Sequence, residues 1–334
     1  MGNSKSVTLA VTAGLAVFAA CGGSIQMYKH TNTAVSHTIQ IRKGDEGFLF
    51  TEGEQKVLFY QRRPRSLDGK YTRADYVHPL YGLDGQILTE DFPADHPHHR
   101  GIFWAWHQVY IGEKRVGDSW SLINIQWDVY EAQILTENAE SRSLRLRVFW
   151  KSPLWTDASG EQKPFIDETT TITVHRAESD IRKIDFEIAL IALEDGVRLG
   201  GADNKKEYGG FSARIKLPDG MEFVGPAGPV EPNLTPLPAA PWMDFSGDFD
   251  GNGKPTGLAI LCHKSNPGYP HLWILRRKRA MQNPVFPGRE PVTLSREKPL
   301  NLRYRLIIHR GNVHNVNLDQ LNAEYNAKNV SRWE

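Results

Sequence analysis

Cysteine is nearly absent from this chain of 334 residues, which contains only Cys21 and Cys262. At most one disulfide is possible, so the fold must be stabilised by an apolar core, which a chain of this length is able to form. Cys262 ends the apolar run at 258–262. We therefore expect Cys262 to be a buried thiol without a chemical role.

An excess of charge is missing as well. The 40 lysine and arginine residues face 39 aspartate and glutamate residues, which leaves a formal net charge of +1. A broad surface for nucleic acid or for an anionic membrane needs a basic excess, so we expect no nucleic-acid partner. The Gly-x-Ser-x-Gly elbow, the phosphate-binding loop and the Cys-x-x-Cys pair are also absent. Their absence removes the commonest hydrolase, nucleotide-binding and zinc-ribbon hypotheses.

Long apolar runs are confined to the N-terminus. Residues 7–20 form an apolar run that is too short to span a bilayer, and it leads into the letters FAACG at 18–22, which are typical of a bacterial lipoprotein signal. We expect residues 1–20 to be a signal peptide, Cys21 to carry the lipid, and residues 21–36 to form a flexible tether. The protein would then be an exported periplasmic or outer-membrane lipoprotein that touches the membrane only through its lipid. Plain secretion is the alternative.

Helical periodicity is scarce, whereas alternation with a period of two is frequent. Apolar and polar residues alternate in 144–148, 184–190 and 302–308, which is the mark of a strand with one buried face. Further strands are expected at 37–43, 47–52, 56–62, 101–111, 127–136, 169–176, 210–217, 256–263 and 271–276. The one convincing helix is 318–327, with Asn317 as its N-cap.

This pattern predicts an all-β protein, a large antiparallel β-sandwich with one short C-terminal helix. An immunoglobulin-like sandwich needs only about 100 residues, and no evident linker divides this much longer chain. We therefore expect a single domain at 37–315, followed by the helix and a tail at 316–334.

Five of the twelve histidines lie in the stretch 76–108, and Asp95 and Arg100 flank the densest part of it. The five are His78, His96, His98, His99 and His107. In one interpretation, His98 or His99 is a general acid or base. Asp95 would then orient an imidazole, and Arg100 would bind a carboxylate or stabilise negative charge.

Two other interpretations of these histidines remain open. His96, His98 and His107 could bind a divalent metal such as copper or iron, since the His-x-His spacing on an extended strand places two imidazoles on one face. Alternatively, the histidines belong to a structural loop and donate to the backbone. No cofactor is predicted apart from this metal.

The segment 103–107 alternates as a strand would, so that Trp104 and Trp106 share one face and His107 lies on the other. In the simpler interpretation both indoles belong to the core. In the functional one, Trp104 offers a flat apolar face to a sugar ring.

A second candidate segment contains Lys206 and Tyr208, followed by two glycines. A neighbouring ammonium lowers the pKa of a phenol and would make Tyr208 a proton donor or acceptor. A strand entry with a tight bend is the alternative. Polar residues at strand ends give further candidates for substrate binding, with polar turns as the alternative: His263, Asn266 and Asn283.

These blocks also occur in a recognisable order along the chain. They are HPLYG at 78–82, DHPHHRG at 95–101, Lys206 with YGG at 208–210, Gly257 with His263 and NP at 266–267, and Arg305 with HRG at 309–311. Together they resemble a bacterial family labelled "methane oxygenase PmoA", from about residue 40 to 312. The resemblance implies a fold like the galactose mutarotase supersandwich, whose members mostly bind or transform carbohydrates and commonly use histidine with a carboxylate for proton transfer. A membrane methane monooxygenase subunit needs several membrane spans, which residues 21–334 do not provide, so oxygenase chemistry is not carried over.

We therefore expect an exported carbohydrate-active protein, an epimerase, lyase or glycoside-cleaving enzyme. Its catalytic residues would be His98, His99, Arg100, Tyr208 and Lys206. Its substrate-binding residues would be His78, Asp95, Trp104, His107, His263, Asn266 and Asn283. The alternatives are a histidine-ligated metal protein and a non-catalytic sugar-binding lipoprotein.

Overall fold

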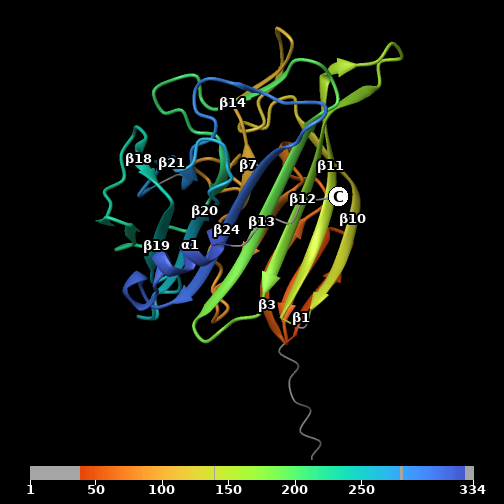
Figure 1. Ribbon diagram of the computed structural model, residues 1–334. Coiled ribbons are helices and arrows are strands. Elements are labelled where there is room, and N and C mark those ends of the chain that lie inside the picture. The colour runs from red at the N-terminus through yellow and green to blue at the C-terminus, as the bar shows by residue number, and fades with distance from the viewer. Residues whose placement is uncertain (1–37, 139, 279–280, 328–334) are drawn as a thin grey trace, which may run out of the picture. The chain divides into compact units, whose positions relative to one another are not determined.

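The computed structural model describes residues 38–138, 140–278 and 281–327. The predicted signal peptide, the lipid-bearing Cys21 and the tether at 21–36 lie outside the described residues. The described part of the chain belongs to one compact unit. It is built mostly from antiparallel strands (Figure 1), as the alternating pattern predicts.

The larger of two facing sheets has nine strands. In spatial order they are β10 (Gln126–Asn138), β11 (Ser141–Thr156), β12 (Gln162–His175), β13 (Ile181–Ala192), β24 (Leu300–Arg310), β20 (Thr256–Cys262), β19 (Trp242–Gly247), β16 (Glu222–Gly225) and β17 (Gly228–Pro229). Strands β10 to β13 follow one another along the chain as a meander, whereas β24 enters between β13 and β20 from the end of the domain.

The second large sheet has six strands. In spatial order they are β1 (Ile39–Lys43), β2 (Gly47–Glu52), β3 (Gln55–Gln61), β6 (Tyr76–Leu80), β7 (Ile102–Ala105) and β15 (Gly210–Ala213). Three smaller sheets complete the fold: β23 (Val292–Thr293), β14 (Val197–Gly200), β8 (Gln108–Ile111) and β9 (Lys114–Gly117); β18 (Leu237–Ala240), β21 (His271–Ile274) and β22 (Asn283–Pro284); and the hairpin of β4 (Arg65–Leu67) and β5 (Lys70–Arg73).

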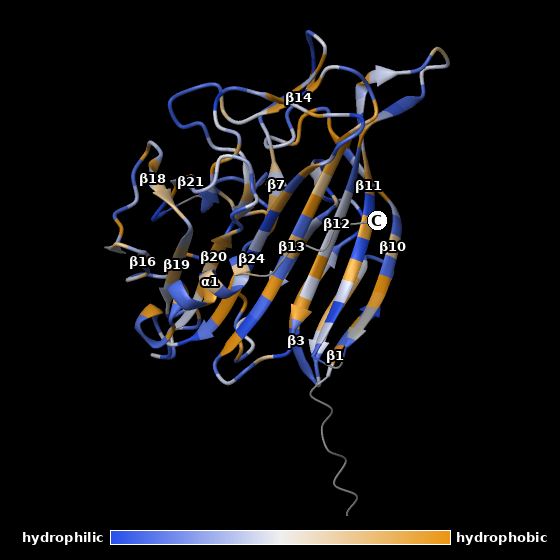
Figure 2. Cartoon of the chain, viewed as in Figure 1, coloured by the Kyte–Doolittle hydropathy of each residue, from blue (hydrophilic) through white to orange (hydrophobic). Residues whose placement is uncertain are grey.

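The core lies between the two large sheets. Alternate residues of β11 and β13 point inward, so that Leu144, Leu146 and Val148 are fully buried while Arg145 and Arg147 between them are partly exposed. Figure 2 shows this alternation as bands of hydrophobic and hydrophilic colour along the long strands. Side chains of both sheets meet in one buried cluster. The prediction of a large antiparallel β-sandwich is confirmed.

The one described α-helix, α1 (Leu318–Ala327), has the predicted bounds and follows a 3₁₀ turn, η1 (Val313–Asn315). The side chain of Asn317 accepts a hydrogen bond from the backbone of Gln320 at 3.0 Å, which confirms the predicted N-cap. Leu318, Leu321 and Tyr325 pack on residues of β19, β20 and β24. The helix therefore covers one end of the nine-stranded sheet. In the part of the chain that the structure describes, no helix has the length and apolarity to cross a membrane.

One predicted strand is interrupted, and the interruption creates the site described below. The segment 101–111 was expected to be continuous, but it divides into β7 and β8 at Trp106 and His107. Ser119 explains the break, because its hydroxyl accepts from the Trp106 amide at 2.8 Å and its own amide donates to the Trp106 carbonyl. Gly101 has φ +57°, and a Cβ there would lie 2.1 Å from the Val77 carbonyl, so no other residue fits at the start of β7.

Candidate functional site

Three histidine rings meet in the loop between β6 and β7. The rings of His96 and His99 are stacked with centroids 4.8 Å apart, and the ring of His98 meets that of His99 edge-on at 4.5 Å. A turn made by the His99 amide and the His96 carbonyl holds the loop in this shape. His99 is buried, whereas His96 and His98 are partly exposed. The loop therefore presents two imidazoles to solvent in front of a third.

Arg214 fixes this loop from the neighbouring strand. It directly follows β15, and its amide donates to the Gly101 carbonyl at 2.7 Å. Its guanidinium donates to both carboxylate oxygens of Asp95, at 2.7 and 3.1 Å, and to Glu90 at 2.7 Å. Asp95 thus positions the loop through Arg214. Burial alone would raise the pKa of Asp95, but the hydrogen bonds from Arg214 and His96 lower it well below the usual range.

The contact with Arg214 also defines the state of His99. The Arg214 guanidinium only donates, so the Nδ1 atom of His99, 3.3 Å away, accepts and the proton lies on Nε2. Burial, followed by His98 and Arg214, lowers the pKa of His99 to about 2. His99 is therefore a neutral, buried ring near neutral pH. It supports the loop, and it is poorly suited to the role of a base that gains a proton.

His98 differs from its neighbours because its ring nitrogens have no hydrogen bond within the described part of the chain. Burial, followed by the nearby His96 and His107, lowers the pKa of His98 to about 4. The ring is neutral near neutral pH and is free to bond a ligand.

The clearest acid–base pair is His107 with Asp118. The hairpin of β8 and β9 pairs Val109 with Gly117, so the residues just outside the hairpin come together. The Nδ1 atom of His107 lies 2.9 Å from the Asp118 carboxylate. The Nε2 atom is buried and has no partner among the described residues. Asp118 therefore holds the proton on Nδ1 and leaves the Nε2 lone pair available.

The Asp118 carboxylate is held in its ionised form. Burial would raise its pKa, but the hydrogen bonds from His107 and from the backbone amide of Ser121 lower the pKa below its usual value. Arg115 adds a cation 3.4 Å away. An ionised carboxylate behind an imidazole is the arrangement that orients a general base.

Tyr208 completes this group. Its ring lies 5.0 Å from the ring of His107 and 4.8 Å from that of Trp120. Burial, followed by Asp118, raises the pKa of the phenol, so Tyr208 keeps its proton near neutral pH. The expectation that Lys206 lowers this pKa is wrong, because Lys206 lies in a turn and does not share a strand face with Tyr208, and it does not contribute to the shift.

A cavity of about 220 Å³ opens beside this pair. Its lining contains aromatic rings and hydrogen-bonding groups, and consists of His107, Gln108, Tyr110, Arg115, Ala202, Asp203, Asn204 and Tyr208. A base with a free lone pair and a protonated phenol therefore lie at one polar cavity. This is an arrangement for moving a proton from one atom of a bound molecule to another.

The structure corrects the role expected of Arg100. Its guanidinium is fully buried and bonds to Asp91, to the Tyr76 hydroxyl and to the Tyr71 carbonyl. The ring of Phe92 stacks over it at 3.6 Å. Arg100 is therefore enclosed by protein groups and has no free face with which to bind a carboxylate of a ligand.

Trp104 is likewise a core residue rather than a sugar-stacking one. It is fully buried, and its Nε1 donates to the carboxyl of Glu168 at 3.0 Å. The predicted alternation is nevertheless correct, since Trp104 and Trp106 belong to the main core while Phe103 and Ala105 belong to a second cluster with Trp120. His78 lies on β6, half-buried, with Nδ1 3.0 Å from the Thr89 hydroxyl.

The remaining predicted binding residues have structural roles. His263 is buried against the ring of Tyr325 in α1, and Asn266 bonds to both backbone groups of Arg303. Both therefore belong to the end of the nine-stranded sheet that α1 covers. Asn283 is fully buried and bonds to the amide and the carbonyl of Gly209. It positions the segment next to Tyr208 and does not reach a ligand.

The predicted metal ligands do not assemble. The ring of His96 meets that of His98 edge-on at 5.6 Å, whereas the ring of His107 packs on Trp120 and Tyr208 and its Nδ1 atom bonds to Asp118. Across residues 38–138, 140–278 and 281–327, no group of three or more histidine, cysteine or acidic side chains is placed to hold a metal ion.

Sequence reasoning missed Asp118, Trp120 and Arg214. Asp118 could have been found, because two short strand patterns around Gly112 indicate a hairpin that returns residue 118 to His107. Arg214 gives no local signal. It meets Asp95 only because β15 pairs with β7, which joins segments more than 100 residues apart.

The chain belongs to DUF6807, a family of unknown function whose model matches residues 48–323. That description names no oxygenase activity. No curated protein is a significant match.

Two solved structures are distantly similar. One is a candidate mutarotase (YeaD) from Salmonella typhimurium, with a TM-score of 0.30 and 10% identity over 82% of this chain and 94% of that one. The other is the GH36 α-galactosidase AgaB from Geobacillus stearothermophilus, with a TM-score of 0.25 and 8% identity over 82% of this chain and 40% of that one. At these scores neither likeness assigns a substrate or a reaction to this chain.

Proposed function

We propose that this member of DUF6807 is a carbohydrate-active enzyme in which His107 is the general base and Tyr208 the general acid. One observation carries the proposal. The Nε2 atom of His107 is buried without a partner while Asp118 occupies Nδ1, and the protonated phenol of Tyr208 stands beside it at a polar cavity. A buried imidazole that leaves one nitrogen unpaired is costly unless a ligand or a water molecule bonds to it.

The pair supports proton transfer at a sugar carbon. His107 takes a proton from the carbon next to a carbonyl or carboxylate, and the electrons of the broken C–H bond pass to that group as an enolate. Tyr208 then gives its proton either to the opposite face of the carbon, which is epimerisation, or to a departing oxygen, which is elimination. Arg115, which lines the cavity, stabilises the negative charge of this enolate.

Hydrolysis of a glycosidic bond fits this cavity less well. That reaction ordinarily uses two carboxyl groups on opposite sides of the bond. The carboxylates at this site are already engaged, Asp118 by His107 and Asp203 by Arg289 at 2.8 Å. We therefore favour an epimerase or a lyase over a glycoside-cleaving enzyme.

The choice of a carbohydrate rests on the lining of the cavity. Tyr110 and Tyr208 supply aromatic rings, while Asn204 and Arg115 supply groups that bond to hydroxyls. The sequence resemblance to a family with a mutarotase-like fold supports the same class of ligand. We also propose that the protein is exported and tethered through a lipid on Cys21, where it would meet extracellular saccharides. The chemistry proposed here uses side chains alone and requires no cofactor.

The test begins with a thermal-shift screen of uronates and oligosaccharides, followed by mass spectrometry of any mixture that raises the melting temperature. Unchanged mass with a changed optical rotation indicates epimerisation. Loss of the leaving group with a new ultraviolet absorbance indicates elimination, because the enolate then collapses to a conjugated unsaturated acid.

The decisive variants are His107→Asn and Tyr208→Phe. Each should lower turnover by about 10²- to 10⁴-fold, the usual loss when a general base or acid is removed, while the melting transition persists. His314→Asn, at an exposed position in η1, is the matched control. Full turnover by folded His107→Asn would overturn the assignment. Binding of a saccharide without any product would make the protein a sugar-binding lipoprotein instead.

A further inference from the structure

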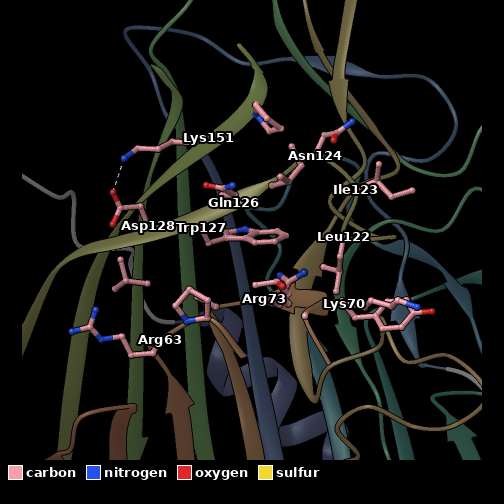
Figure 3. Close-up of a pocket in the computed structure, with 18 of the residues that line it drawn as sticks. Arg63, Lys70, Arg73, Leu122, Ile123, Asn124, Gln126, Trp127, Asp128 and Lys151 are labelled. Carbon is pink, nitrogen blue, oxygen red and sulfur yellow. Dashed lines mark hydrogen bonds and ion pairs between the residues drawn. The ribbon is translucent and has the colours of Figure 1, made fainter. Parts of the chain in front are cut away.

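A second and larger cavity, of about 850 Å³, has a different set of lining residues. Three segments form most of its wall, together with Lys151 and Pro153: residues 62–64, 69–74 and 121–129. Figure 3 shows the indole of Trp127 in the middle of this wall, with Arg73 against it, Lys70 and Leu122 to one side, and Lys151 to the other. Its volume is in the range of small-molecule binding sites.

The charge of this wall is strongly positive, although the whole chain is nearly neutral. Five cationic side chains line the cavity and only one carboxylate, Asp128, which already pairs with Lys151 at 2.6 Å. The five are Arg62, Arg63, Lys70, Arg73 and Lys151. Arg63 and Lys70 have no ion pair or side-chain hydrogen bond within the described part of the chain. Like charges at this density repel one another unless an anion lies among them.

Three buried hydrogen-bond donors of the same wall have no partner among the described residues. They are the Nε atoms of Arg62 and Arg73 and the indole Nε1 of Trp127. Arg73 is only 1% exposed, and its other nitrogens donate to the carbonyls of Trp104 and Ser119. All three unpaired atoms are donors, so the missing partner is an acceptor.

Arg73 is held in place by protein groups that keep it charged. Its guanidinium lies 4.4 Å from the ring centre of Trp127 and 5.1 Å from that of Phe103. Burial lowers its pKa to about 10, while the nearby Asp75 acts in the opposite direction. A guanidinium with that pKa is still a cation near neutral pH.

The backbone of this wall is also unusual. Tyr71, Leu122 and Asn124 have positive φ angles, of 54°, 61° and 56°. Side chains larger than glycine rarely adopt this conformation, and in structures it gathers at ligand sites where the surroundings impose it. Tyr71 and Ile123 are exposed at the rim.

The cavity is distinct from the one at His107, since the two share no lining residue. The ring pair Phe103 and Trp120 connects them, with ring centres 5.4 Å apart. Trp120 packs on the ring of His107, while Phe103 carries Arg73 on its ring. These two aromatic rings therefore separate a ligand in one cavity from the other cavity.

We propose that the cavity lined by Arg63, Lys70, Arg73 and Trp127 is a binding site for an anionic saccharide, whose carboxylate or sulfate groups supply the acceptors that this wall lacks. The anionic part follows from the charge and the unpaired donors alone. The saccharide part rests on the proposed function, together with the exposed ring of Tyr71 at the rim. This site would hold an acidic polymer at a distance from the group that reacts.

The test is calorimetric titration of the whole folded protein with three probes. These are a tetrasaccharide of galacturonate, a sulfated tetrasaccharide and a neutral glucose tetrasaccharide. We expect saturable binding of a charged probe that weakens as salt increases, because ion pairs at a partly open site are screened. Equal binding of the neutral probe, or no binding of either charged probe, would overturn the proposal and leave water as the partner of the three donors.

The variant that decides is the double change Arg63→Gln with Lys70→Gln. Both positions are exposed, so the fold should persist, and affinity for the charged probe should fall about tenfold. The matched control is Lys43→Gln with Lys298→Gln, which removes the same charge from exposed positions elsewhere and should change nothing. An equal loss of affinity in both double variants would indicate general electrostatic attraction and would contradict a specific site. Binding that persists in His107→Asn separates this proposal from the catalytic one.

Discussion

Replacing Glu168 with glutamine should weaken the contact between the two large sheets. Glu168 lies on β12 of the nine-stranded sheet and is fully buried. It accepts from Trp104 of the six-stranded sheet at 3.0 and 3.1 Å, from Trp150 at 2.9 Å and from the Thr170 hydroxyl at 2.6 Å. One carboxyl group therefore satisfies three donors from three strands.

The size of the effect follows from counting acceptors. A carboxylate offers about four acceptor positions and an amide oxygen only two, while the amide nitrogen of glutamine presents hydrogens to the remaining donor. A buried donor without a partner costs about 1–3 kcal/mol, so Glu168→Gln should lower the free energy of unfolding by roughly that amount. Glu168→Ala leaves both indoles unpaired and also opens a cavity, so it should cost about 3–6 kcal/mol.

The pH dependence gives an independent check. Burial raises the pKa of Glu168, although the three donors act against this. The folded protein therefore holds the proton to higher pH than the unfolded chain does, and this contribution to stability is lost as pH rises from about 4.3 towards the folded pKa. Glutamine does not titrate and lacks this pH dependence, so the difference in the free energy of unfolding between wild type and Glu168→Gln should narrow as pH rises.

Guanidinium unfolding, followed by tryptophan fluorescence, measures these changes. Glu161→Gln, an exposed position just before β12, is the control and should stay within about 0.5 kcal/mol of wild type. A Glu168→Gln protein that is as stable as this control would refute the argument that the carboxyl group joins the sheets.

Three further predictions concern the site and the N-terminus. Asp118→Asn should move the His107 proton towards Nε2 and reduce turnover at least about 10²-fold, which nitrogen NMR of the imidazole and kinetics would show; an unchanged tautomer contradicts the role of Asp118. The pKa of His98 falls from 6.5 to about 4 on folding, so the unfolded chain binds the proton at a higher pH than the folded protein, and stability should rise with pH between these values. His98→Gln should flatten this rise in a series of melting curves, and an identical slope in the variant would contradict the prediction. Cys21→Ser should abolish the lipid mass and release the protein from the membrane fraction, whereas an unchanged distribution speaks against lipidation.

Much of the fold was predictable because alternation is a local property. The run at 144–148 alternates in the sequence and becomes the inward and outward faces of β11, and Asn317 caps α1 where the helical spacing begins. The break at Trp106 was not predictable, because the group that causes it, Ser119, comes from the next turn of the chain. The local sequence pattern predicts strands and helices, whereas the residues at which they end depend on hydrogen-bonding groups from elsewhere in the chain.

The candidate site shows the same limit more sharply. The histidine cluster was visible because its members are adjacent, and their rings do meet. Adjacency does not reveal which side of the chain faces solvent, so Arg100 was expected at the ligand but is enclosed by Asp91, Tyr76 and Phe92. Arg214 was missed because strand pairing alone brings it to the cluster.

The four residues of strand β7 contribute one face to the main core and the other face to the cluster beside the candidate site, and this limits which changes of chain length the protein tolerates. A one-residue insertion or deletion there would exchange the two faces of the strand, turning Trp104 away from Glu168 and Phe103 into the space between the sheets. The same change would shift His107 relative to Asp118. Insertions and deletions in related sequences should therefore occur at the exposed turn 157–160 and be rare at 101–107, where adding or removing one residue alters both stability and chemistry.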